Sequence, residues 1–253
     1  MIGLPGLVSM DWKTAKGEVV ERLWLRIRAP FAAFRQFQAG GYRATFPVMP
    51  PSAAYGLVLN LAGIEMRGPL QGVTTGIREG LPEMGIAIGL LERPRVERLF
   101  QQLHSYPVGL TASRKIEMTH GAKYHISPAR REILVGYDGM IGVQSDDREL
   151  LRQVRKGVSG ELETDRYGLP FLGDNSFMID EIELVEEPPP TWWYVLLESD
   201  ARHRRGICRL TVAIDRLDNS LTTGVVMAPL ESRHQFPPEK SWIKTYGRPG
   251  RQG

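Results

Sequence analysis

The chain has 253 residues, of which 42% are hydrophobic and 24% are charged, as in a globular domain large enough to bury a core. Its 27 glycines and 18 prolines favour turns and extended segments over a helical bundle. The formal net charge of only +3 is weak evidence for a nucleic-acid partner, so the distribution of charge matters more than its total. The single cysteine, Cys208, excludes disulfides and multi-cysteine zinc sites, and no run of about 18 apolar residues predicts a membrane span.

The first predicted element is a strand over residues 23–28. Apolar side chains alternate along it with cationic or aromatic ones: Leu23, Leu25 and Ile27 on one side, and Trp24, Arg26 and Arg28 on the other. Because successive side chains of a strand point to opposite faces, this pattern predicts one face on a core and one cationic, aromatic face.

The stretch between Glu21 and Glu65 contains arginines but no acidic residue. Its arginines, with the one at its start, are Arg22, Arg26, Arg28, Arg35 and Arg43. Uncompensated cationic charge of this kind points to a phosphate-rich partner. Interleaved rings at Trp24, Phe34 and Tyr42 suit base stacking beside the phosphates. The alternatives are a solvated basic surface and, for Trp24, a place in the core.

Further elements follow in chain order. Pro50-Pro51-Ser52 begins a predicted helix over residues 51–62, because proline fits the first helical position, and residues 84–92 read as a buried strand. Residues 93–105 place apolar side chains at i, i+3, i+4 and i+7, namely Val96, Leu99, Phe100 and Leu103. This spacing predicts an amphipathic helix that Pro107 ends. The segment that follows, up to Arg130, is basic and without a clear period, as in an extended hairpin or loop.

The second half begins with apolar residues on both sides of Asp138-Gly139, which predict a hairpin turn within residues 132–144. Asp146 and Glu149 then form a capping-box pattern for a short helix that ends at Gly157. The side chains expected to face inward from this helix are Leu150, Leu151 and Val154. After the prolines of residues 188–190, strands are predicted over residues 192–198 and 207–214. The order fits a βαββαβ, ferredoxin-like α+β fold with insertions.

Three blocks of sequence together resemble one known family. They are LWLRIRAPFAAFRQFQAGG with PPSAAYGLVLNLAG in residues 23–63, REILVGYDGMIGV at residues 131–143, and YGLPFLGDNSFMID at residues 167–180. The third block is the most specific, because GLPFLGDN followed by an aromatic residue is an uncommon string. The chain from residue 20 to residue 185 thus resembles the CRISPR-associated Cas-five family of the RAMP superfamily, and its details look most like the Myxococcus-type branch.

The resemblance implies a ferredoxin-like (RRM-like) RAMP domain over residues 20–187, with an inserted extended thumb hairpin at about residues 107–131. It also implies an N-terminal extension over residues 1–19 and a C-terminal β-rich extension with a basic tail over residues 188–253. The implied function is that of a non-catalytic, cytoplasmic subunit of a prokaryotic type I Cascade complex that binds and caps the 5′ handle of the guide RNA (crRNA). Its partners would be the backbone subunit, the large subunit and, through the complex, target DNA in antiviral defence. No cofactor, metal or membrane partner is expected.

The residues expected to bind RNA lie in three parts of the chain. They are Arg26, Arg28, Phe34, Arg35, Gln36, Tyr42, Arg43 and Ser52 in the first, Arg114, Lys115, His120, Lys123, His125 and Arg130 in the thumb segment, and Gly173 and Asn175 in the third block. Gly173 would let the backbone approach a ligand closely, and Asp174 is expected to support the site.

Two other functions stay open at this point. One branch of the family cuts the repeat RNA itself with a tyrosine, a lysine and a histidine, so the second hypothesis is a metal-independent endoribonuclease that processes precursor crRNA. Tyr42, Lys123 and His125 are its candidates, because such chemistry needs a general acid/base pair and a cation. The third hypothesis is an unrelated basic interaction protein. Cleavage of RNA separates the second from the first, and specificity for the handle separates the third.

Overall fold

The computed structural model describes residues 20–36, 42–71, 74–107, 124–197, 204–216 and 218–245, with the main chain alone described at residues 69–71, 74, 103–107, 124–127 and 219. The strands are β1 (Glu21–Ala32), β2 (Tyr42–Arg43), β3 (Arg67–Gln71), β4 (Thr74–Ile77), β5 (Met84–Glu92), β6 (Arg95–Pro107), β7 (Tyr124–Ser145), β8 (Glu181–Val185), β9 (Trp192–Leu196), β10 (Cys208–Ala213), β11 (Thr223–Pro229) and β12 (Ile243–Thr245). The α-helices are α1 (Pro51–Leu61) and α2 (Arg148–Ser159), and short 3-10 turns occur at Asn219–Leu221 and Glu239–Ser241.

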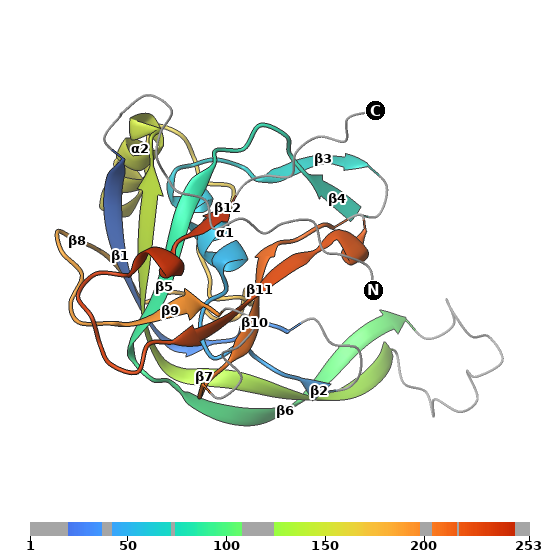
Figure 1. Cartoon of the computed structure of the whole chain (residues 1–253). Coiled ribbons are helices and arrows are strands. Elements are labelled where there is room, and N and C mark those ends of the chain that lie inside the picture. The colour runs from blue at the N-terminus through green and yellow to red at the C-terminus, as the bar shows by residue number, and fades with distance from the viewer. Residues whose placement is uncertain are drawn as a thin grey trace, which may run out of the picture.

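One large sheet dominates the described part of the chain (Figure 1), as expected for a mixed α+β protein. Its strands follow the order β10-β11-β9-β5-β7-β1-β8, while β12 pairs with β5, and β2 and β6 pair with β7. All of these pairs are antiparallel except β2 with β7. The C-terminal strands therefore extend the same sheet that the first strand begins.

The main hydrophobic core lies between the sheet and the two helices. Leu23, Leu25 and Ile27 of β1 are buried there, as the alternation along that strand predicts, and α1 packs against both α2 and β5. Burying a side chain of this kind completely is worth roughly 1.5–3 kcal/mol. The predicted buried strand is also confirmed, because only the last residue of β5 is exposed.

A second, smaller core covers the opposite face of the sheet. Trp24 of β1 packs at 5.9 Å between ring centroids against Trp193 and at the same separation against Trp242, and Phe236 lies 6.0 Å away. The segment after β11 thus folds back over β1. Trp24 is 6% exposed and belongs to this core, so its ring is not available for base stacking.

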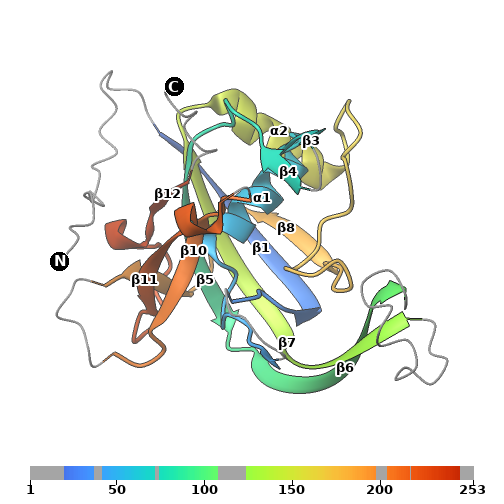
Figure 2. The same ribbon diagram turned by 90° about the vertical axis from the view of Figure 1, so that its right-hand side faces the viewer.

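Strands β6 and β7 leave the body of the molecule together as a curved two-stranded arm (Figure 2). Their pairing runs from Arg95 opposite Val135 to Pro107 opposite Tyr124. The predicted helix over residues 93–105 is therefore wrong. Its apolar residues sit on both faces of a β-ribbon with Val96, Leu99 and Phe100 exposed, so cross-strand pairing with β7 overrides a spacing that matched a helix.

The predicted turn at Asp138-Gly139 is also wrong, because β7 continues straight through these residues. Asp138 lies opposite Arg28 of β1, and Gly139 lies opposite Ile27. A side chain at residue 139 would overlap the ring of Tyr137, so this glycine makes room for packing within a central strand.

Helix α2 has the predicted inward face, with Leu150, Leu151 and Val154 buried, but its ends differ from the prediction. Asp147 is the N-cap, one residue later than expected, and accepts a 3.0 Å hydrogen bond from the Leu150 N–H. The helix ends at Gly160, which is left-handed at φ 76°. Gly157 instead lies where α2 touches α1.

We expect Gly157→Ala to destabilise the protein, although alanine favours a helix over glycine by about 1 kcal/mol. A Cβ at residue 157 would overlap the carbonyl oxygen of Leu61, and overpacking costs roughly 1–3 kcal/mol. Thermal unfolding should show a lower midpoint by a few degrees, at roughly 2–4 °C per kcal/mol for a chain of this size. Gly168→Ala is the control, because no atom lies within 4 Å of its added Cβ. A midpoint for Gly157→Ala at or above that of the wild type would contradict the packing argument.

Candidate nucleic-acid interface

A small cavity of about 220 Å³ lies where the end of β1, strands β2 and β7 and the loop before β8 meet. It is lined by Ala33, Arg35, Arg43, Ala44, Arg131, Glu132, Gly173 and Asp174. Three of the predicted RNA-binding residues, Arg35, Arg43 and Gly173, thus come together from two distant parts of the sequence.

The two arginines are positioned by a short ladder between residues 34–36 and residues 44–46. Phe46 donates its backbone N–H to the Phe34 carbonyl over 2.8 Å, and Gln36 donates its backbone N–H to the Ala44 carbonyl over 3.2 Å. The buried Thr45 hydroxyl accepts the Phe34 N–H over 2.9 Å. Since these bonds satisfy the buried backbone groups, the segments stay extended and place their arginines on the cavity.

The loop of the third block is held against the end of β1 by its backbone. Ala33 donates its N–H to the Leu172 carbonyl over 3.1 Å, and Phe177 donates its N–H to the Asp174 carbonyl over 2.9 Å. Gly173 is left-handed at φ 77°, and a Cβ there would overlap the Ala33 carbonyl oxygen. Glycine is therefore required for the loop to approach β1 this closely.

Arg131 and Asp174 join β7 to this loop at the wall of the cavity. Their side chains form a 2.7 Å ion pair, and the Arg131 guanidinium also lies 4.9 Å from the ring centroid of Phe177. Burial acts to raise the pKa of Asp174, but hydrogen bonds from Ser176 and from Arg131 outweigh it and leave that pKa below its ordinary value. The Asp174 carboxylate is thus ionised at neutral pH, and its contact with Arg131 fixes the loop.

The other two arginines of the cavity differ from the arginines of β1 in whether they have acidic partners. Arg35 and Arg43 form no ion pair with any residue that the structure describes. Arg26, in contrast, holds Asp138 through two hydrogen bonds of 2.7 and 3.0 Å, and Arg28 is paired with Glu181 of β8. The predicted cationic face of β1 is largely neutralised, whereas the cavity keeps uncompensated charge.

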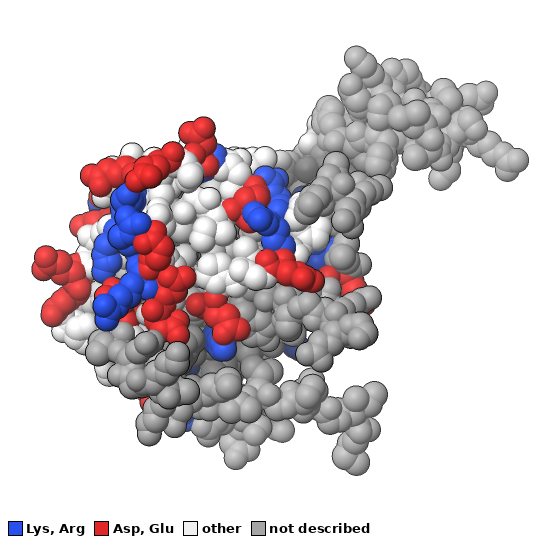
Figure 3. Space-filling view, turned by 90° about the horizontal axis from the view of Figure 1, so that it is seen from above, with Lys and Arg blue, Asp and Glu red and all other residues white. Residues whose placement is uncertain are grey.

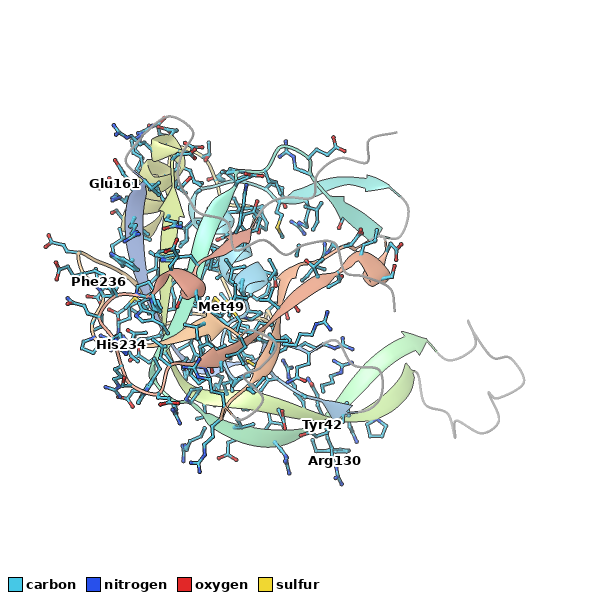
Figure 4. The ribbon with its side chains drawn as sticks, viewed as in Figure 1. Tyr42, Met49, Arg130, Glu161, His234 and Phe236 are labelled. Atoms are coloured by element: carbon cyan, nitrogen blue, oxygen red, sulfur yellow. The ribbon has the colours of Figure 1, made fainter. Side chains whose placement is uncertain are left out.

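Tyr42 is fixed beside the cavity by Glu132. Its hydroxyl donates to the Glu132 carboxylate, which also accepts the Thr45 backbone N–H over 3.1 Å. The hydrogen bond to Glu132 raises the pKa of Tyr42, with burial as a smaller cause in the same direction. Figure 4 shows Tyr42 next to Arg130, part-way along the arm.

The remaining predicted residues lie in different surroundings. Phe34 is 2% exposed and packs edge-on against Tyr137, so its ring serves the core. Gln36 donates to the Thr45 carbonyl, Ser52 is half-buried in the first turn of α1, and Asn175 is exposed next to Asp174. Arg114, Lys115, His120 and Lys123 lie outside the described residues, as does the side chain of His125. Two lining residues, Arg131 and Glu132, were not among the predicted site residues, and only their place at the start of the second block hinted at them.

On the face seen from above, charge is mixed in sign. In the view from above, basic and acidic side chains lie next to one another on the α2 side of the molecule (Figure 3). Arg152 pairs with Glu149 over 2.5 Å, and Lys156 pairs with Glu163 over 2.9 Å. No cluster of His, Cys, Asp or Glu suited to a metal ion, and no helix long and apolar enough to cross a membrane, occurs in the described ranges.

The chain is similar to one family model and to two solved chains. Residues 22–134 match a family model described as "CRISPR-associated protein (Cas_Cas5)". A solved chain titled "CRISPR RNA-guided surveillance complex" superposes with a TM-score of 0.53 at 12% identity, covering 84% of this chain and 90% of that one. A second, titled "Crystal structure of Cas protein", has a TM-score of 0.44 at 12% identity, covering 85% of this chain and 96% of that one. No curated protein matches.

We expect Asp174→Asn to lower the free energy of unfolding by roughly 1–3 kcal/mol at neutral pH, because a mostly buried guanidinium would lose its charged partner. The folded-state pKa of Asp174 lies below its ordinary value of 3.8, so the stabilisation is complete above that pH and is lost as the pH falls through the folded-state value. Urea unfolding at a series of pH values should show a constant gap between wild type and variant down to about pH 5, and a narrowing gap below pH 4.

Asp180→Asn is the matched control for this series, because Asp180 is exposed in the same segment and its side chain makes no ion pair with a described residue. It should change the free energy of unfolding little at any pH. A gap for Asp174→Asn that stays the same at low pH would show that the carboxylate acts through shape and not through its charge.

Proposed function

We propose that the chain is a Cas-five-type subunit of a CRISPR surveillance complex, and that its cavity binds the 5′ handle of the crRNA without cutting it. The observation that carries the proposal is the pair Arg35 and Arg43, which face the cavity without an acidic partner among the described residues. Guanidinium groups bind phosphate through two parallel hydrogen bonds, so two unpaired ones beside a glycine-supported loop suit an RNA backbone.

Family membership is supported from two sides. The matched residues, 22–134, run from β1 into the middle of β7 and include Arg35, Arg43 and Arg131 of the cavity. The third block, with Gly173 and Asp174, lies beyond that match and packs onto it through the loop contacts described above. The fold is shared with a chain of a complex whose title names it RNA-guided.

The ferredoxin-like reading is supported by strand order. The four strands β5-β7-β1-β8 are neighbours in that order, with α1 following β1 and α2 following β7. This is the order that a βαββαβ chain gives when its first and third strands lie in the centre. The described arm, which pairs residues 95–107 with residues 124–135, overlaps the two ends of the expected thumb hairpin at about residues 107–131 and supports that assignment.

The size of the cavity favours a phosphate or part of a nucleotide over a free cofactor. Its volume of about 220 Å³ is below the roughly 300–1,000 Å³ of ordinary small-molecule pockets. Target choice would then come from pairing between guide and DNA, while the protein holds the handle, contacts the backbone and large subunits and works in the prokaryotic cytoplasm.

A non-catalytic role is favoured by the state of Tyr42. A tyrosine that activates a 2′-hydroxyl must give up its own proton readily, yet the bond to Glu132 raises the pKa of Tyr42. The same bond makes Tyr42 a fixed surface ring, which suits binding.

The test is to incubate the purified chain, in chelator, with end-labelled repeat RNA from its own locus and with a scrambled RNA. Each sample is then divided between a native and a denaturing gel. Intact RNA with a shift that depends on the handle sequence is the expected result. A single cut within the repeat, abolished by Tyr42→Phe, Lys123→Ala or His125→Ala, would make the chain a processing nuclease, and equal shifts with both RNAs would make it an unspecific basic protein.

Replacing Arg35 and Arg43 together by alanine should weaken handle binding and reduce its salt dependence. If each arginine neutralises one phosphate, the slope of log K against log salt should become shallower by about 1.4, which is twice the ~0.7 expected per phosphate of a single strand. Fluorescence anisotropy between 50 and 300 mM salt measures both quantities.

The control for this experiment is the double variant Arg152→Ala, Arg155→Ala. It removes the same net charge from the exposed surface of α2, away from the cavity-lining residues. An equal change of slope in both double variants would show that only total charge matters and would remove the cavity from the proposal.

A further inference from the structure

Three residues from three strands form a row across the middle of the arm. Phe100 of β6 lies opposite Arg130 of β7, and Tyr42 of β2 lies opposite the same Arg130 on its other side. Neighbouring strands are about 4.8 Å apart, so the two aromatic residues stand on either side of the arginine at a backbone separation of about 10 Å.

The row faces solvent on one side of the ribbon. Phe100 is 67% exposed and Tyr42 is 39% exposed, and Arg130 between them is exposed as well. Two residues further along each strand, Arg98 lies opposite Glu132 on this same face, and the Arg98 Nε lies 3.9 Å from a carboxylate oxygen of Glu132. The face therefore presents two rings with two guanidinium groups beside them.

Glu132 gives this face its fixed geometry. It accepts hydrogen bonds from the Tyr42 hydroxyl and from the Thr45 backbone, and it faces Arg98. The ring of Tyr42 is thus held in one orientation before any ligand arrives, which lowers the entropy cost of binding. Glu132 is engaged in these contacts, so Arg130 keeps its charge uncompensated by any described residue.

The chemistry of the row favours a single-stranded nucleic acid over an apolar protein segment. Proteins that hold single strands combine aromatic rings for the bases with a cationic surface for the phosphates. An apolar partner would bury Phe100 but would also cover the Arg130 guanidinium, and a buried charge without a partner is costly. A phosphate between two splayed bases instead supplies that partner.

We propose that Phe100 and Tyr42 stack against two bases of a single-stranded RNA while Arg130 and Arg98 contact the phosphates between and beside them. The row deepens the proposed function, on which it rests, because it extends RNA contact from the cavity onto the outer face of the arm. Stacking of this kind tolerates any base, so the row supplies affinity and leaves handle specificity to other residues.

The test compares the full chain with its Phe100→Ala variant on two fluorescein-labelled probes of equal length and charge, an oligouridine and the same ribose-phosphate chain without bases. Fluorescence anisotropy at 50 mM salt is the readout. Phe100→Ala should weaken binding of the oligouridine roughly five- to a hundredfold, because this probe offers bases for stacking. The same variant should change binding of the abasic chain little. Phe100→Trp should retain the affinity for the oligouridine.

Leu99→Ala is the matched control, since Leu99 is exposed on the same strand and lies on the opposite face of the ribbon. It should leave the affinity for both probes unchanged. Any of three results would overturn the inference: the oligouridine affinity of Phe100→Ala is unchanged, both probes lose the same affinity, or the wild type does not bind oligouridine. An unchanged oligouridine affinity would leave a contact with another protein as the reason for the exposed ring of Phe100.

These data distinguish a wrong stacking proposal from a wrong proposed function. If the stacking proposal is wrong, Phe100→Ala and the wild type bind the oligouridine with equal affinity and bind the abasic chain with equal affinity, whether or not binding depends on the handle sequence. If the proposed function fails, repeat RNA and scrambled RNA bind equally, while the base-dependent effect of Phe100→Ala persists.

Discussion

Continuous pairing along β7 is the constraint on which the other features depend. In the body of the molecule β7 lies between β1 and β5, and in the arm it pairs with β6 and β2. The strand that buries Ile141 in the core therefore also carries Arg131 to the cavity and Arg130 to the outer face of the arm. A site built on one uninterrupted strand inherits the rigidity of the core, because every residue of the strand is held by neighbours on its sheet.

Acidic residues decide which of the arginines remain available to a ligand. Arg26 and Arg28 of β1 meet Asp138 and Glu181 on the neighbouring strands, so their charge is used within the sheet. Such cross-strand pairs stabilise a sheet modestly and fix register more than they add stability. The arginines that follow β1 in the chain escape this neutralisation, because both carboxylates of the cavity are already engaged. Asp174 pairs with Arg131, and Glu132 accepts hydrogen bonds from Tyr42 and Thr45.

Local sequence patterns predicted the strands and helices that bury at least one face in a core. The apolar run of β5 and the proline at the start of α1 each reflect a single dominant constraint, and both predictions were confirmed. The alternation along β1 correctly predicted the face that is buried in the main core, but Trp24 on the other face lies in the second core. Strand β6 was predicted as a helix because residues 95–100 are exposed on both faces of the strand, which leaves it without a period of two. Two further contacts could not be predicted, namely the packing of Trp242 on Trp24 and the ion pair of Asp174 with Arg131. Each joins residues more than forty positions apart, and the local spacing of residue types carries no information about such contacts.

The alternation of side chains along β7 also limits how this strand can change in length. Arg131 lines the cavity and Arg130 points to the stacking face, while Glu132 lies at the edge of both, since it lines the cavity and also holds the Tyr42 hydroxyl. The register with β1 fixes Tyr137 on the core side. Inserting one residue between Glu132 and Tyr137 would exchange the two faces of the arm relative to the core, whereas inserting two would restore them. Insertions or deletions in this part of the strand should therefore be tolerated only when they change its length by an even number of residues. The packing of the body thus limits how the length of the arm can vary.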